Sequence, residues 1–204
     1  PKKHALAQGV KQSTGTILMF TDADCAPPPT WIAETLNLFS QKTGMVIGFS
    51  PYEYEKENWF AKFVKLDAMA LASLAASTSG WRRRATCNGR NLAYRKSVYN
   101  QVGGFSKINQ FVSGDDDLFL KLVLNKTDWQ VRYAYDSRLV VPTKGLAGFK
   151  QFYNQRIRHA SKGLHYGTKQ VAVLSLIYLY YLLLFIVLPV SLFTSFWLTG
   201  LGMF

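Results

Sequence analysis

The C-terminal end of the chain is the feature that most constrains its fold. Residues 171–204 contain no Asp, Glu, Lys or Arg, and they begin with the run VAVLSLIYLYYLLLFIVLPVSLF. An α-helix needs about 20 apolar residues to cross a bilayer, and a secretory signal would instead stand at the N-terminus. The sequence therefore predicts a transmembrane helix within residues 170–204, in which Pro189 marks a place where the span can kink or end.

The formal net charge of +12 sits almost entirely on the first 169 residues. Basic side chains gather just before the apolar segment: Lys144, Lys150, Arg156, Arg158, Lys162 and Lys169. The positive-inside rule then predicts a cytoplasmic polar domain at the cell membrane, next to anionic lipid headgroups. Because membrane lipids explain this charge, nucleic acid is not expected as a partner. Cys25 and Cys87 lack metal-ligand spacing, so neither a zinc site nor a disulfide framework is indicated.

The first 144 residues alternate helix and strand patterns, which predicts an α/β domain. A basic interfacial segment is expected over residues 145–169, followed by the transmembrane segment 170–204. Parallel sheets are built from strand, helix, strand units. A domain that opens on a helix is therefore expected to have an earlier strand upstream of Pro1. Helices are expected over residues 1–12, 28–39, 59–76 and 117–124, and strands over 17–20, 44–49, the segment that ends at Tyr94, and 129–135.

Two carboxylates, Asp22 and Asp24, follow the apolar strand predicted at residues 17–20. Ligands of open α/β sheets bind at the carboxyl ends of the strands. Carboxylate oxygens suit Mg²⁺ or Mn²⁺, which neutralise the charge of a bound diphosphate. Taken alone, the pair is better explained by a solvated acidic turn, so its interpretation as a metal site depends on the rest of the chain.

A second acidic cluster, Asp115 to Asp117, opens the helix expected at residues 117–124. Acids in the first turn of a helix are stabilised by about 0.3–1 kcal/mol each, so helix capping is one explanation of the cluster. A carboxylate held among other carboxylates is also a good proton acceptor for a hydroxyl group. The cluster thus predicts a general base near the first acid pair.

A third element, Gln155 to His159, lies on the basic stretch before the apolar segment. The three elements, in this order, resemble glycosyltransferase family 2, the inverting enzymes of the GT-A fold, and in particular its membrane-anchored members related to cellulose, chitin and hyaluronan synthases. The resemblance covers residues 2–169. It implies a partial GT-A (Rossmann-like) nucleotide-sugar transferase domain, followed by a juxtamembrane amphipathic helix and a transmembrane helix. The family's first strand and its contacts to the nucleotide base would lie upstream of Pro1.

The resemblance also implies roles for the two acidic motifs. Asp22 and Asp24 would bind the metal ion, Mg²⁺ or Mn²⁺, and through it the diphosphate of the donor, with a UDP-sugar as the first choice. Gly114-Asp115-Asp116 matches the motif that supplies the catalytic base. The base is then Asp115 or Asp116, and a leucine three residues further on, Leu118, favours Asp115.

Two further segments match the family. Gln155 and Arg158 fit its Gln-x-x-Arg-Trp motif, in which His159 replaces the tryptophan, and they would help to hold the diphosphate and the acceptor end. The segment with Asn88, Gly89 and Asn91 resembles the part between the donor and acceptor sites, so these residues are substrate-binding candidates. The acceptor would be a saccharide or a lipid-linked saccharide.

The implied activity is metal-dependent transfer of a sugar from a nucleotide-diphosphate sugar to an acceptor hydroxyl, with inversion, at the cytoplasmic membrane face. Two alternatives remain open. The chain could be a non-catalytic basic membrane protein that binds lipid or a partner, in which case charge matters and the particular acids do not. It could also be a metal-dependent lipid phosphotransferase that uses the same acids.

Overall fold

The computed structural model describes residues 2–78, 86–109, 111, 114–160 and, nearer the C-terminus, 175–176, 179–180, 182–183 and 186–187. The chain divides into two compact units, Pro1–Asn154 and Gln155–Phe204, and each is described by itself. The helices are α1 (Lys2–Gln12), α2 (Trp31–Leu36), α3 (Trp59–Thr78), α4 (Lys96–Gln101), α5 (Asp117–Lys126) and α6 (Phe149–Ala160), with short 3₁₀ turns η1 (Ser106–Ile108) and η2 (Ser137–Leu139). The strands are β1 (Ile17–Phe20), β2 (Thr43–Gly48), β3 (Tyr52–Glu53), β4 (Leu92–Arg95), β5 (Gln130–Ala134) and β6 (Thr143–Lys144).

The main sheet has four strands in the order β1-β4-β2-β5. Strand β4 runs antiparallel to both β1 and β2, while β2 and β5 are parallel. Strands β1, β2 and β5 therefore point the same way, and their carboxyl ends lie at one edge of the sheet. Every residue of β2 is buried, as expected for an inner strand that is covered on both faces.

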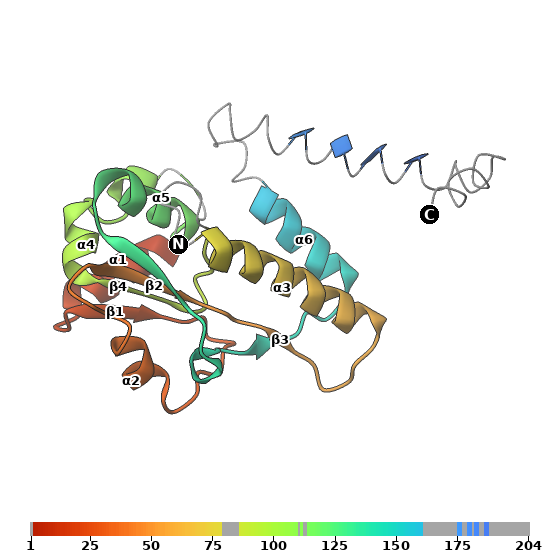
Figure 1. Cartoon of the computed structure of the whole chain (residues 1–204), viewed down its shortest axis with the longest axis horizontal. Coiled ribbons are helices and arrows are strands. Elements are labelled where there is room, and N and C mark those ends of the chain that lie inside the picture. Colours follow the sequence, from red (N-terminus) through yellow and green to blue (C-terminus); the bar gives the residue numbers. More distant parts are fainter. Residues whose placement is uncertain are drawn as a thin grey trace, which may run out of the picture. The chain divides into compact units, whose positions relative to one another are not determined.

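Helices cover both faces of this sheet (Figure 1), with α1, α4 and α5 on one side and α2 on the other. Alternate residues of one strand therefore enter different cores. Met45 and Ile47 belong to the larger core under α1, α4 and α5. Val46, between them, packs with Trp31 of α2 in the smaller core. This two-sided burial positions the strand ends that carry the acids.

A small parallel sheet, β3 with β6, supports helix α3. Val64 and Ala68 of α3 pack in a core with Leu146 and with Phe152 of α6. The ring of Phe152 also lies 5.4 Å, centroid to centroid, from the ring of Phe63. The first turn of α6 is therefore attached to α3 within the first unit.

The expected elements are largely those observed, and the differences have local causes. Helix α2 begins at Trp31 rather than at residue 28, because the carbonyl of Pro28 accepts a hydrogen bond from the Trp31 N–H in a preceding turn. Helix α5 extends to Lys126 and ends where Thr127 becomes extended. The antiparallel direction of β4 is new, since the apolar pattern of a strand carries no information about its direction.

The expected membrane span at 170–204 lies mostly outside the described residues. Within the residues that the structure does describe, no helix has the length and apolar character needed to cross a bilayer.

Gly48 offers a test of the packing at the edge of β2. A Cβ added there would lie 2.2 Å from Nδ2 of Asn91, and that amide is held by hydrogen bonds to the carbonyls of Phe49 and Leu139. Gly48→Ala is therefore expected to lower the free energy of unfolding by about 1–3 kcal/mol. Denaturant unfolding of the full chain in detergent measures the change.

The control is Gly9→Ala on α1, where an added Cβ has nothing within 4 Å. Alanine there is expected to raise the free energy of unfolding by up to about 1 kcal/mol, because it favours helix more than glycine does. Equal effects of the two substitutions would show that the Asn91 side chain yields without cost.

Candidate functional site

The first acid pair lies in a turn that is anchored on a distant segment. The N–H of Cys25 donates to the Asp22 carbonyl at 3.1 Å and closes the turn, and the N–H of Lys144 donates to the Asp24 carbonyl at 3.2 Å. The backbone is thus held while the carboxylates stay accessible, Asp24 exposed and Asp22 half-buried. The turn expected from the sequence is real, and it presents its acids at the carboxyl edge of the sheet.

The ammonium group of Lys2 connects the two acidic clusters. Its Nζ lies 2.9 Å from Oδ1 of Asp22 and 3.2 Å from Oδ2 of Asp115. Burial favours the neutral amine, but the hydrogen bond that Lys2 donates to Asp22 and the charge of Asp115 outweigh burial and raise the pKa of Lys2. A cation therefore lies between two carboxylates that are far apart in the sequence, Asp22 and Asp115.

The other two acids of the second cluster hold a neighbouring loop. Asp116 caps α5 by accepting from the N–H of Asp117 at 2.7 Å, and its other oxygen accepts from the N–H of Gly89 at 3.3 Å. Asp117 accepts from the hydroxyl of Thr86 at 2.8 Å and from the N–H of Cys87 at 2.9 Å. These carboxylates fasten the loop before β4 to the start of α5.

Asp115 is paired differently from these two acids, and the backbone before it directs its side chain toward Lys2. Gly114 has φ +101°, a conformation that glycine adopts without a Cβ penalty. A Cβ at Gly114 would also lie 2.5 Å from Cδ1 of Leu118. The chain can therefore turn sharply into α5, and Asp115 faces Lys2 with only 12% of its side chain exposed.

A small pocket is lined by Lys2, Asp22 and Asp115 together. Polar groups stand on one side of it and apolar and aromatic side chains on the other; its lining is Lys2, Leu6, Phe20, Thr21, Asp22, Gly89, Leu92, Tyr94, Phe105 and Asp115. Burial raises the pKa of the Tyr94 phenol, with further contributions from Tyr99 and from the charge of Asp115. Tyr94 is therefore neutral at the pocket wall. The arrangement suits a ligand with negatively charged or hydroxyl groups next to a proton acceptor.

The acid pair fits a divalent cation by its chemistry. In the described part of the chain, no group of three or more His, Cys, Asp or Glu side chains is placed to hold a metal ion. Mg²⁺ is nevertheless commonly held by one or two carboxylates together with substrate phosphates and water. Asp22 and Asp24 supply two carboxylates in one turn, and Asp24 is exposed, so their chemistry fits an ion of this kind.

The three candidates before β4 differ in position. Gly89 lines the pocket, whereas Asn88 accepts hydrogen bonds from the N–H and Nε of Arg90 and shapes the loop. Asn91 is buried in the core, and its side chain bonds to Trp31 and to two carbonyl groups. Asn91 therefore holds strands and helices together, and it does not line the pocket.

The residues of the third motif lie on α6. Gln155 and Arg158 belong to the second compact unit, and the side chain of His159 lies outside the described part. Helix α6 begins before this motif, at Phe149.

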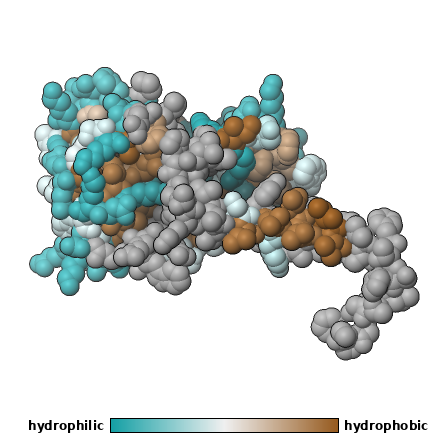
Figure 2. Space-filling model, turned by 90° about the horizontal axis from the view of Figure 1, so that it is seen from above, coloured by the Kyte–Doolittle hydropathy of each residue, from teal (hydrophilic) through white to brown (hydrophobic). Residues whose placement is uncertain are grey.

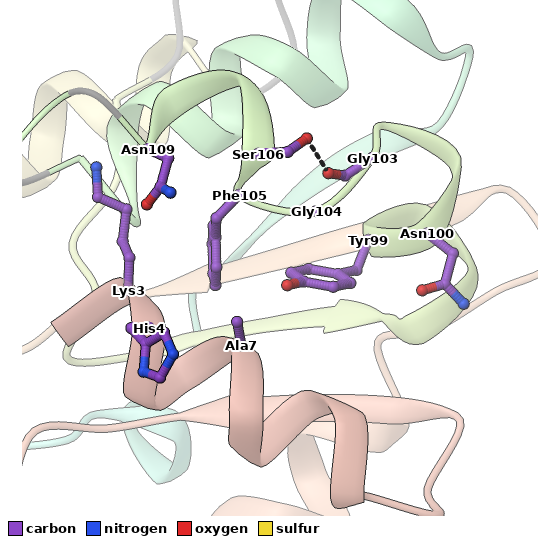
Figure 3. A pocket seen from close by; sticks show the side chains of 10 residues that line it. All are labelled: Lys3, His4, Ala7, Tyr99, Asn100, Gly103, Gly104, Phe105, Ser106 and Asn109. Carbon is purple, nitrogen blue, oxygen red and sulfur yellow. Dashed lines mark hydrogen bonds between the residues drawn. The ribbon is translucent and has the colours of Figure 1, made fainter. Parts of the chain in front are cut away.

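A larger cavity, of about 470 Å³, opens between the start of α1 and the turn after α4. Figure 3 shows Lys3, His4, Tyr99 and Phe105 around it. The Lys3 ammonium donates hydrogen bonds to the carbonyls of Ile108 and Phe111. None of the acidic candidates lines this cavity. We therefore place the candidate site in the smaller pocket, because that pocket contains Asp22 and Asp115.

Lys2 is the site residue that sequence reasoning missed. A signal for it exists in the order of elements. A helix that packs antiparallel against the strand that follows it places its first turn at that strand's carboxyl end. A lysine in the first turn of the opening helix is then a neighbour of Asp22.

Known proteins that are similar to this chain include glycosyltransferases. Residues 17–204 match the family described as "Glycosyl transferase family group 2". The chain is also similar to "Glycosyltransferase AglE" of Haloferax volcanii, with 27% identity over 128 residues. These residues are 63% of this chain and 40% of that protein, so the chain spans less than half of the relative's length. The family match covers most of the chain and confirms the family that the motifs predicted: the chain belongs to glycosyl transferase family group 2.

Proposed function

We propose that this chain carries the catalytic pocket of an inverting glycosyltransferase that acts at the cytoplasmic face of the cell membrane. The enzyme moves a sugar from a nucleotide-diphosphate sugar, with UDP as the first candidate nucleotide, to a hydroxyl of a saccharide or of a lipid-linked saccharide. The observation that carries the proposal is the meeting of Asp22 and Asp115 at the Lys2 ammonium. It joins a phosphate-side acid pair to a candidate base in one pocket.

Asp115 is the proposed base. Asp116 and Asp117 accept backbone N–H groups that keep the loop in place, whereas Asp115 faces the pocket. Its carboxylate takes the proton of the acceptor hydroxyl while the acceptor oxygen bonds to the anomeric carbon. The bond from that carbon to the diphosphate oxygen breaks in the same displacement, and its electron pair leaves with the diphosphate. One displacement inverts the anomeric centre.

The donor phosphates are proposed to lie on the side of Asp22 and Asp24. The Lys2 ammonium there carries a positive charge suited to phosphate oxygens. Asp22 and Asp24 would hold Mg²⁺ or Mn²⁺, which when bound supplies Lewis-acid stabilisation of the developing charge on the diphosphate. Phe20, Tyr94 and Phe105 form an aromatic wall of the pocket that Asp115 also lines.

The third motif and the C-terminal segment complete the proposal. Arg158 would add a bidentate phosphate contact that a lysine cannot replace, Gln155 would orient a hydroxyl or phosphate oxygen, and His159 would lie beside the acceptor. A membrane span within residues 170–204 would keep the pocket near lipid-linked acceptors. The family match supports glycosyl transfer over both a purely lipid-binding protein and a lipid phosphotransferase.

The base assignment predicts different results for two neighbouring acids. Asp115→Asn in the full-length enzyme is expected to lower the rate of sugar transfer by about 10²–10⁴-fold, because the proton acceptor is lost, and to leave donor binding largely intact. Radiolabelled sugar transfer and calorimetric titration with UDP-sugar measure the two quantities.

Asp116→Asn is the matched control for this substitution. Asparagine caps helices as well as aspartate does and, of the two hydrogen bonds described above for Asp116, gives up the longer, 3.3 Å bond from the Gly89 N–H, so this variant is expected to fold and to keep transfer within a few-fold of the wild type. Loss of transfer in the Asp116 variant alone would move the base to Asp116, and full transfer in both variants would remove the cluster from the mechanism.

The phosphate assignment predicts a change in metal dependence. Asp24→Ala is expected to abolish the gain in UDP-sugar affinity that Mn²⁺ produces, because the ion loses a carboxylate ligand. Titration with the donor in Mn²⁺ and in EDTA measures this gain. Asp128→Ala, which removes an exposed acid before β5 at the other end of the sheet, serves as the control and is expected to keep it. If both variants kept the same gain in affinity with Mn²⁺, the acid pair would be a turn that binds no metal ion.

A further inference from the structure

We infer that the outward face of α3 binds the surface of an anionic lipid bilayer. This face is defined by five large apolar residues, and their exposed fractions are Trp59 75%, Phe63 46%, Leu66 67%, Met69 56% and Leu74 52%. The inference rests on the membrane location proposed above, to which it adds a contact surface within the domain itself.

The face is a continuous stripe and not a scatter of single residues. Trp59, Phe63 and Leu66 follow one another at intervals of four and three residues, and Leu74 continues the same side of the helix. The opposite side supplies Val64 and the alanines that pack in the core. Apolar residues therefore occupy the outward side of α3 as well as its core side, and Lys62, Lys65 and Asp67 are the charged residues of the helix. An outward apolar side of this kind lies against lipid or a partner.

The start of α6 enlarges the surface. Phe149 is 63% exposed and Tyr153 is 55% exposed, and their rings stack with centroids 6.5 Å apart. Phe152, between them, is fastened to α3 through its contacts with Phe60 and Phe63. Figure 2 shows hydrophobic residues reaching the surface among hydrophilic ones on the face that it displays. Exposed Trp, Tyr and Phe side chains on one surface are typical of the interfacial region of a bilayer.

The charges beside these residues select lipid as the partner. Lys62 and Lys150 are exposed next to the apolar side chains. The one acid of α3 is Asp67, and Glu57, just before the helix, is paired with Lys65. Basic residues near a bilayer surface gain about 1 kcal/mol each from anionic headgroups. An apolar stripe rimmed by lysines therefore matches the apolar depth and the negative surface of such a membrane. The charge-free segment that begins after Lys169 is the part of the chain expected to bring the domain to it.

Site-specific fluorescence tests this surface in the full chain reconstituted into vesicles of phosphatidylcholine and phosphatidylglycerol. In a background with Cys25→Ser and Cys87→Ser, the dye NBD is attached at Leu66→Cys or Leu74→Cys. The matched control is Ile32→Cys on α2, an apolar residue that is also largely exposed, at 59%. All three side chains are more than half exposed, so the labels disturb little of the core.

Quenching by nitroxide-labelled lipid is expected to be roughly twofold or more stronger at positions 66 and 74 than at position 32, with iodide in the water giving the reverse order. Equal lipid quenching at the three positions would overturn the inference. So would protection of positions 66 and 74 from both quenchers, since a second copy or residues 170–204 would then cover the face.

Two accompanying measurements separate this inference from the proposed function. Flotation of the vesicles reports membrane attachment of the chain as a whole, and UDP-sugar titration reports the acidic pocket. A chain that floats and binds donor but exposes positions 66 and 74 to iodide would leave the proposed function in place and remove the α3 surface. A chain that does not float would overturn the α3 surface together with the membrane location.

Discussion

Burial of the inner strands on both faces is the constraint on which the rest of the structure depends. Strand β2 is wholly buried, and β4 lies beside it between two layers of helices. Asn91, at the entry to β4, ties Trp31 and the carbonyls of Phe49 and Leu139 together. Leaving the Asn91 amide unpaired would lower the free energy of unfolding by about 1–3 kcal/mol. The same hydrogen bonds therefore favour this strand order, the close approach of Gly48 and the position of the loop before β4.

The acidic pocket follows from that scaffold by electrostatics. Like charges repel, and three consecutive acids at the start of α5 would be unfavourable without partners. Each of the three meets a different group: the N–H of Gly89 for Asp116, the N–H of Cys87 for Asp117, and the Lys2 ammonium for Asp115. The result is a loop held by two carboxylates and a third carboxylate, Asp115, that lines a pocket.

Much of the fold could be predicted from periodicity alone. The apolar run before Asp22 and the helical spacing from Trp59 to Leu74 have strong local signals, and both elements form where expected. The direction of β4 and the start of α2 were not predictable in this way. Strand direction depends on which partners are available, and a helix after consecutive prolines begins only where a turn has closed.

The sequence by itself determined the family, the two acidic motifs and the charge-free C-terminal segment, because residue type and spacing along the chain carry that information. Only the tertiary structure decided which acid faces the pocket, that Asn91 belongs to the core, and that Lys2 joins Asp22 to Asp115. These decisions rest on contacts between residues 20 or more positions apart. Such contacts exist only after the sheet has brought the carboxyl end of β1 and the start of α5 together.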